Sequence, residues 1–206
     1  MSTSIRRAAI WSSVFALMTA QHAAAVDYYT VDPMHTSVVF SVAHSGFSYT
    51  YGFFRKATGT YKLDKDNPAN NSFSFLIDAN SLDTNNQERD KHLRSPDFFD
   101  VQQYPTITFE STRCTPSNTQ DGMIYQLTGN LTIHGVTKSV SIPLRMLGSG
   151  PGPYKDQRSG FLCQIELKRT DFGMNELLKD NLVGDAVGIT VSFEGSLQQP
   201  GTAPVR

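Results

Sequence analysis

The chain has 206 residues, with 18 Lys and Arg against 19 Asp and Glu, a formal net charge of −1. This near-neutral balance excludes the electrostatic footprint typical of proteins that bind nucleic acids or anionic membranes. The length and the 13 phenylalanines are sufficient for one apolar core in a single domain.

Residues 1–25 have the composition of a secretory signal peptide. Arg6-Arg7 form a basic start, residues 8–18 are mostly apolar, and Ala23-Ala24-Ala25 offers small residues for cleavage. The apolar run, about eleven residues, is too short to span a bilayer, which needs roughly twenty. We therefore predict a periplasmic protein that begins near Val26. Cleavage leaves 181 residues with a formal charge of −3 and without tryptophan, because the only tryptophan lies in the removed segment.

The rest of the chain is dominated by alternation of apolar and polar residues at period two, which predicts strands with one buried and one wet face. Residues 49–63 read as one or two further strands, bent at Gly52 and Gly59. The apolar sets are Val38, Phe40, Val42 and His44; Phe73, Phe75, Ile77 and Ala79; Ile107 and Phe109; Tyr125, Leu127, Gly129, Leu131 and Ile133; Val140, Ile142, Leu144 and Met146; Phe161, Cys163, Ile165 and Leu167; Ile189, Val191 and Phe193.

These sets predict an all-β fold of about eight antiparallel strands at residues 26–197. Eight strands close into a barrel just wide enough for side chains or one small ligand, and closure removes exposed sheet edges. A two-sheet sandwich fits the alternation almost as well. The segment 148–153, rich in glycine and proline, predicts a flexible hairpin loop, and residues 198–206 predict a disordered tail.

One or two short helices interrupt the strands. Residues 84–93 are mostly polar and begin with Thr84-Asn85-Asn86-Gln87, which fits a capping box with Thr84 as N-cap. Pro96 ends this helix, and Phe98 and Phe99 then need an apolar environment. The segment is either a capped surface helix held by an aromatic plug or a lid over a pocket. A second helix is expected at 175–181.

The sequence contains no recognisable catalytic, metal-binding or cofactor-binding motif. None of the remaining histidines, at 35, 44, 92 and 134, has metal-ligand spacing. Glu88 and His92 are expected to form an ordinary i,i+4 surface pair. We therefore predict neither an enzyme nor a cofactor.

Two cysteines remain in a compartment that permits disulfides. Alternation places Cys163 on the inward face of its strand and Cys114 on the outward face, opposite Ile107 and Phe109. Side chains on opposite faces of a sheet rarely meet the geometry of a disulfide. The two thiols are therefore predicted to be unpaired, unless a bulge at a strand end reverses the face of Cys114.

Several motifs, in a fixed order from about residue 27 to 197, resemble those of the YceI-like, polyisoprenoid-binding family. The motifs that carry the resemblance are Tyr29-Thr30-Val31-Asp32, His35 to His44 with Gly46-Phe47, Gly52-Phe53-Phe54, Ser81-Leu82-Asp83-Thr84, His92 to Ser95, Asp97 to Asp100, Pro105 to Ser111, Gly129 to Thr137, and Arg169 to Met174.

The resemblance implies a periplasmic, lipocalin-like antiparallel barrel whose apolar tunnel holds a polyisoprenoid or another long-chain amphiphile, such as an isoprenoid quinone or a fatty chain. It also implies a homodimer and, in some members, an association with a membrane cytochrome. An enzyme that uses the barrel as a substrate tunnel, with His44 or Asp97 as reactive group, is the alternative. A barrel filled by its own side chains is a third.

The predicted ligand-binding residues are inward-facing apolar side chains and two polar ones. His44 and Arg94 are expected to contact the polar head, and Phe98 and Phe99 to close or line the entrance. The remaining predicted contacts are Phe40, Val42, Phe47, Phe54, Phe75, Ile77, Phe109, Leu131, Phe161, Phe172 and Met174.

Overall fold

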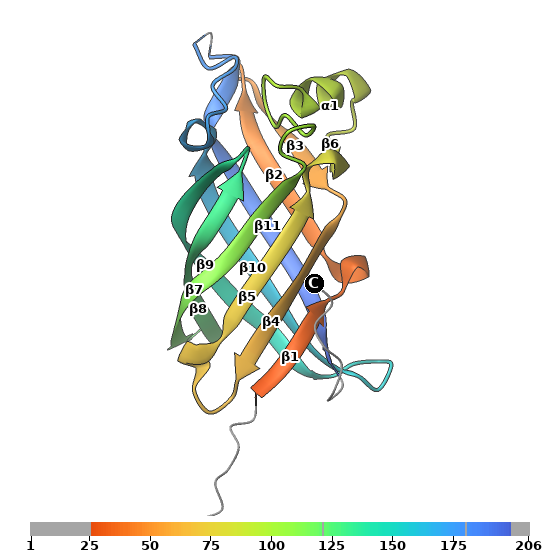
Figure 1. The fold of residues 1–206 in the computed structure, drawn as a ribbon, viewed down its shortest axis with the longest axis vertical. Coiled ribbons are helices and arrows are strands. Elements are labelled where there is room, and N and C mark those ends of the chain that lie inside the picture. Colours follow the sequence, from red (N-terminus) through yellow and green to blue (C-terminus); the bar gives the residue numbers. More distant parts are fainter. Residues whose placement is uncertain (1–25, 121, 180, 199–206) are drawn as a thin grey trace, which may run out of the picture.

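The computed structural model describes residues 26–120, 122–179 and 181–198 and shows a closed, eight-position antiparallel β-barrel (Figure 1). The barrel prediction is thus confirmed over the sandwich. The predicted signal peptide and residues 199–206 of the predicted tail lie outside the described residues. The strands are β1 (Val26–Val31), β2 (Ser37–His44), β3 (Ser48–Phe54), β4 (Ala57–Asp64), β5 (Ser72–Asp78), β6 (Leu82–Asp83), β7 (Thr106–Thr119), β8 (Gly122–Ile133), β9 (Val136–Pro151), β10 (Gln157–Lys168) and β11 (Val183–Leu197).

Two of the eight positions are each shared by two strands. The order β1-β4-β5-β7-β8-β9-β10-β11 closes through pairing of β1 with β11. β11 pairs with β1 near its C-terminal end and with β2 along the rest of its length. β1 and β2 therefore share the position beside β11. β3 and β4 share the next position, because β3 pairs with β2 and β4 pairs with β1. β6 adds a short pairing to β3.

Asp32 fixes the place where β11 changes partner. Its backbone N–H donates to Glu194 O at 2.9 Å, and its carboxylate accepts from the N–H of Met34 at the start of the 3₁₀ turn Pro33–His35. Its Oδ2 lies 2.9 Å from His35 Nδ1 and 2.8 Å from Arg158 Nη1. These contacts lower the pKa of Asp32 to about 2, and the hydrogen bond with His35 has the largest effect.

The end of the barrel away from the helix is packed with aromatic rings. Tyr61 stacks on Tyr29 and Phe73, with ring centroids 4.8 and 5.5 Å apart, and Phe161 stacks on Phe193 at 5.2 Å. All five side chains are buried. This cluster closes one end of the interior, as side chains do in barrels of this size.

The helix α1 (Gln87–Arg94) lies at the opposite end of the barrel (Figure 1). Its N-cap is Asn86, whose side chain accepts from the Arg89 N–H at 3.0 Å, so the prediction of Thr84 as N-cap is wrong. The reason is that Thr84 is buried and bonded to Asp90. The backbone N–H and the hydroxyl of Thr84 both donate hydrogen bonds to Asp90 Oδ1, at 2.8 and 2.5 Å. No helix in the described ranges combines the length and apolarity that a bilayer crossing needs.

Two other local predictions are corrected by the backbone. Residues 176–179 and 181 form turns and residue 175 is irregular, so the expected helix is absent from the described part of this segment. Both Leu177 (φ 57°) and Asn181 (φ 52°) adopt the left-handed conformation, which interrupts a helix. The predicted hairpin loop at 148–153 is shorter than expected, because β9 continues to Pro151 and pairs with β10 there. Gln198, assigned to the tail, donates its N–H to Tyr28 O at 2.7 Å.

A β-bulge reverses the predicted orientation of Cys114. The register of β7 against β8 shifts between Ser111 and Arg113, so Cys114 pairs with Leu127 and is buried inside the barrel. An extra residue in one strand moves all following side chains to the other face. Cys163 is also inside, as predicted, and both thiols are free. The predicted unpaired state is thus present, although the argument from opposite faces is wrong.

Replacement of Asp32 by Asn tests its role in barrel closure. We expect Asp32→Asn to lower the free energy of unfolding at neutral pH by about 2 kcal/mol, since it removes hydrogen bonds to a charged group. A carboxyl with a depressed pKa stabilises the fold above its unfolded pKa of about 3.9, and this contribution is lost as the pH falls towards 2. The difference between the two proteins in urea denaturation should therefore shrink below about pH 4. An equal difference at all pH values would contradict this role.

Candidate functional site

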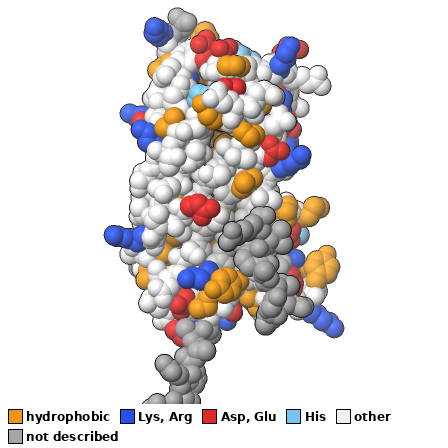
Figure 2. All heavy atoms as spheres, viewed as in Figure 1, with side chains coloured by type: hydrophobic (Ala, Val, Ile, Leu, Met, Phe, Trp, Pro, Cys, Tyr) orange, Lys and Arg blue, Asp and Glu red, His pale blue; other side chains and the backbone are white. Residues whose placement is uncertain are grey.

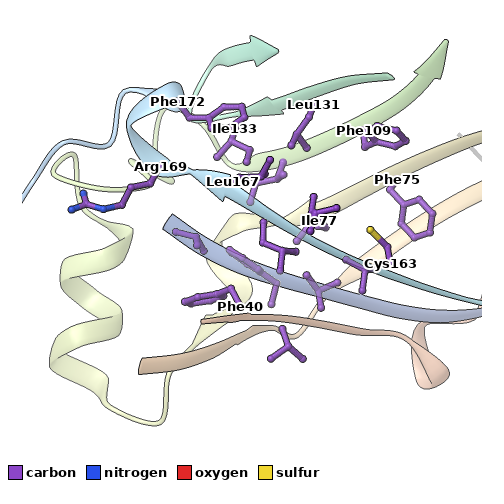
Figure 3. A pocket seen from close by; sticks show the side chains of 18 of the residues that line it. Phe40, Phe75, Ile77, Phe109, Leu131, Ile133, Cys163, Leu167, Arg169 and Phe172 are labelled. Atoms are coloured by element: carbon purple, nitrogen blue, oxygen red, sulfur yellow. The ribbon is translucent and has the colours of Figure 1, made fainter. Parts of the chain in front are cut away.

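An apolar cavity with a volume of about 200 Å³ occupies the part of the barrel nearer to α1 (Figure 3). Thirty residues line it, and all but Lys168 and Arg169 are apolar. Ordered water requires several polar partners, which this wall does not provide. The cavity is therefore suited to an apolar ligand or the apolar part of an amphiphile.

The structure brings eleven of the fifteen predicted ligand-binding residues to the cavity wall. They share an inward orientation on the strands or lie in the segments that cover the α1 end. They are Phe40, Val42, Phe54, Phe75, Ile77, Phe98, Phe99, Phe109, Leu131, Phe172 and Met174.

Neither His44 nor Phe47, at the outer end of β2 and in the turn after it, reaches the cavity. His44 is on the same side of β2 as Phe40, but it is exposed at the strand end. Phe47 follows Ser45 and Gly46, which both have positive φ (49° and 71°), and it projects into solvent with 93% exposure. The geometry of this turn, which alternation does not reveal, explains why Phe47 lies outside the cavity.

Arg94 and Phe161 also lie outside the cavity wall. The guanidinium of Arg94 donates to the backbone carbonyls of Asn80, at 3.0 Å, and of Leu82, and so ties α1 to β6. Phe161 is fully buried but belongs to the aromatic cluster beyond the deep end of the cavity. Arg94 therefore has a positioning role in this structure, and Phe161 a packing role.

The segment that contains α1 covers one end of the cavity, as expected for a lid. Leu93, Phe98 and Phe99 all line the cavity, and the ring of Phe99 meets that of Phe54 edge-on at 5.5 Å. Phe98 is buried against the ring of His92 at 5.0 Å. The aromatic pair thus both anchors the helix and forms part of the cavity wall.

Contrary to the predicted pairing with Glu88, His92 pairs with Asp97. Its Nε2 lies 3.1 Å from Asp97 Oδ2, and both side chains are exposed. This pair is on the outside of the lid, so its geometry does not provide a nucleophile or base to the cavity. Among the described residues, no group of three or more His, Cys, Asp or Glu could hold a metal ion.

Arg169 holds the second segment that covers the α1 end of the cavity, residues 169–174. It is buried, and its Nε, Nη1 and Nη2 donate to the carbonyls of Gly184, Met174 and Val183 at 2.8, 2.8 and 2.9 Å. Burial lowers the pKa of Arg169 from its usual value, and Phe98 lies 6.0 Å from the guanidinium. Figure 3 shows the guanidinium directed away from the cavity. Arg169 therefore holds the covering segment in place and does not contact a ligand through its guanidinium.

Part of the wall was absent from the predicted ligand contacts. β11 contributes Val183, Val187, Ile189 and Val191, and β10 contributes Cys163 with its neighbours at positions 165 and 167. Alternation identifies most of these residues as inward-facing, and that signal was sufficient to find them. The register shift between Val183 and Val187 made the start of β11 harder to recognise.

The distribution of charged side chains on the surface agrees with the near-neutral composition, which excluded binding to nucleic acids or anionic membranes. On the face seen in Figure 2, acidic and basic side chains are interspersed, and no broad area of that face carries a single charge. Such a surface does not favour binding to a polyanion.

Comparison with known proteins assigns residues 29–195 to the family described as YceI-like domain. A UPF0312 protein of Pseudomonas aeruginosa is 42% identical over 184 residues, which cover 89% of this chain and 93% of that protein. Protein YceI of Escherichia coli O157:H7 is 37% identical over the same shares of the two chains. The similarity therefore extends over nearly all of the barrel.

Solved structures show the same fold. BcnA of Burkholderia cenocepacia is 26% identical with a TM-score of 0.71, over 80% of this chain and 98% of that one. The YceI protein of Campylobacter jejuni is also 26% identical, with a TM-score of 0.65 over 74% and 88%. A polyisoprenoid-binding domain of Saccharophagus degradans, 16% identical, has a TM-score of 0.65 over 82% and 98% and shares the fold.

The buried thiols give a direct test of the interior. Burial raises the pKa of Cys114 to about 11 and that of Cys163 to about 12, and the thiolate is the reactive form. We expect a maleimide at neutral pH to label neither thiol in the native protein and both after denaturation without reductant, as read by mass spectrometry. Two blocked thiols in the denatured sample, or rapid native labelling, would contradict the structure.

Proposed function

The chain belongs to the YceI-like family, and we propose that its barrel is a periplasmic carrier for an isoprenoid lipid or a similar amphiphile. The observation that carries this proposal is the cavity wall, in which 28 of 30 residues are apolar. A cavity of this kind accepts an apolar tail and leaves the polar head at its edge. The polyisoprenoid-binding description of the Saccharophagus degradans domain supports an isoprenoid as the tail.

The head group is proposed to decide which lipid is retained. Burying a methylene from water stabilises by about 0.8 kcal/mol, but a lipid tail in a bilayer is already out of water. Its transfer to the barrel therefore gains little free energy from the tail alone. The wall has two charged residues, but Lys168 alternates with the inward-facing Leu167 and is exposed, and the guanidinium of Arg169 donates to backbone carbonyls. We therefore place the head at the α1 end of the cavity, where neither His44 nor Arg94 lines the wall.

The alternatives raised by the sequence receive less support. The family indicates no enzymatic activity, and the cavity wall contains no His, Asp or Glu. A barrel filled entirely by its own side chains does not fit a cavity of about 200 Å³. The homodimer and the membrane cytochrome partner stay proposals that rest on the family resemblance.

Native mass spectrometry tests the carrier and its location together. The protein should be recovered from the periplasmic fraction without detergent, with a mass that begins at or near Val26 and with one lipid per barrel. Extraction and fragmentation of that lipid identify its class. A mass that retains residues 1–25 would contradict export with cleavage, and protein that is free of lipid, and takes up none when mixed with lipid extract, would contradict the carrier.

Phe99 is expected to control retention of the ligand. Phe99→Ala removes the ring that packs on Phe54 at the covered end, so ligand release should accelerate by about tenfold, equivalent to about 1.4 kcal/mol of lost contact. Phe47→Ala is the matched control, because that ring is 93% exposed and outside the cavity. Release is followed by transfer of a fluorescent isoprenoid to acceptor vesicles. Equal rates in both variants would show that Phe99 is only a surface plug.

A further inference from the structure

Among the described residues, one strand of the barrel wall lacks a neighbour over part of its length. β3 pairs with β2 along its whole length, but on its other side only its last two residues pair with β6. After β6 the chain turns towards α1, and the methyl group of Thr84 lies against Gly52 of β3. Residues 48–51 of β3, which we call the free edge, therefore have β2 on one side and no strand on the other.

The backbone groups of Tyr49 and Tyr51 point towards the missing neighbour. The N–H of Arg55 donates to Ser81 O at 3.1 Å, on the side of β3 that faces away from β2. The register of β3 against β2 is continuous, and backbone groups of alternate residues in a strand point to the same side. The N–H and C=O groups of Tyr49 and Tyr51 therefore face the same side as the Arg55 N–H. Within residues 26–120, 122–179 and 181–198, no backbone hydrogen bond from another segment reaches them there.

The free edge carries none of the features that usually protect the edge of a sheet. Such edges are commonly blocked by lysine, by proline or by a bulge that twists the strand away. Residues 36–54, which include β2, the turn and β3, contain no Asp, Glu, Lys, Arg or Pro, and the register of the two strands is unbroken. Tyrosine and threonine, which occupy the free edge, also favour extended backbone. This edge is therefore a template for one more strand.

Exposed aromatic rings border the free edge on the outside of the barrel. The side chains of Tyr49 and Tyr51 are 65% and 62% exposed. The next outward ring on β3, that of Phe53, lies 4.5 Å from the guanidinium of Arg55, which pairs with Asp83 of β6 at 2.9 Å. The outer face is thus covered where β6 supplies a neighbour, and two rings stay open where the neighbour is missing. Open tyrosine rings of this kind are typical of protein interfaces.

The surroundings of the free edge suit a single extended segment better than a second barrel. α1 contacts β6, which continues the line of the free edge, and Figure 1 shows α1 projecting past the barrel wall at this end. A second barrel has to pass α1 before its own edge comes within the roughly 4.8 Å that separates paired strands. A single segment needs only the width of one strand.

We propose that the free edge of β3 binds an extended, uncharged segment of a partner protein, which adds one strand to the barrel wall beside Tyr49 and Tyr51. The segment exchanges backbone hydrogen bonds with these two residues and places alternate apolar side chains against their rings, as in other cases of strand addition. Its uncharged character follows from the absence of charged residues between positions 36 and 54. This site lies on the wall outside the cavity and does not depend on the proposed lipid binding.

The probe for the test is a fluorescent peptide of residues 37–44 with a solubilising tail, because this uncharged strand already pairs with the other side of β3. Binding is measured by fluorescence anisotropy, and amide hydrogen exchange is followed by NMR. The amide hydrogens of Tyr49 and Tyr51 should exchange rapidly in the free protein and become protected when the peptide binds. Those of Thr50 and Gly52, which face β2, should be protected in both states.

Proline at position 51 removes the outward N–H without breaking the ladder to β2, and edge strands tolerate proline in that orientation. Tyr51→Thr is the matched control, because it also removes the ring but keeps the N–H. Tyr51→Pro should bind the peptide about tenfold more weakly than Tyr51→Thr, since one hydrogen bond is lost and a peptide carbonyl is left unpaired. Thermal unfolding verifies that both variants are folded.

A second measurement leaves the protein unchanged. N-methylation of one alternate set of peptide amides should abolish binding, and N-methylation of the other set should not, because only one set faces the free edge. The proposal is overturned if the peptide fails to protect the amides of Tyr49 and Tyr51, if these amides are already protected in the free protein, or if the folded Pro and Thr variants bind equally. Protection that grows with protein concentration in the absence of peptide would assign the edge to a second copy and would also overturn it.

Discussion

The interior of an eight-stranded barrel has room for large side chains or for a ligand at any one level, but not for both. In this protein the two uses are separated along the axis. Aromatic rings around Phe161 fill the end away from α1, and a mixture of aliphatic and aromatic side chains surrounds a cavity at the other end. The position of the boundary between rings and cavity therefore decides both how stable the barrel is and how much ligand it can hold.

The remaining features of the structure keep this division in place. Asp32 and Arg158 hold the strand exchange that closes the barrel beside the aromatic end. At the other end, Arg169 binds three backbone carbonyls and Arg94 binds two, so the covering segments are fixed by buried or partly buried guanidinium groups. Neither arginine is placed to recognise a lipid head. Both serve the geometry of the wall, in which apolar side chains make the contacts.

Alternation in the sequence was sufficient to predict the strands and most of their inward-facing residues, because burial of one sheet face imposes a period of two. The choice of a barrel over a sandwich rested on the family resemblance. Local geometry limited the rest. A bulge before Arg113 turned Cys114 inward, and positive φ values carried Phe47 outward. Phe161 has the same inward pattern as Phe109, yet Phe161 packs beyond the deep end of the cavity and Phe109 lines the cavity. That difference depends on the stagger between strands, which a single strand does not encode.

The most direct test of this division is a crystal structure of the protein with an isoprenoid lipid bound. Electron density for the apolar chain should follow the cavity wall from the α1 end, with Phe161 and Tyr61 unmoved. Density that continues past Phe161 towards Tyr29, or an interior closed by side chains with the lipid outside it, would contradict the account.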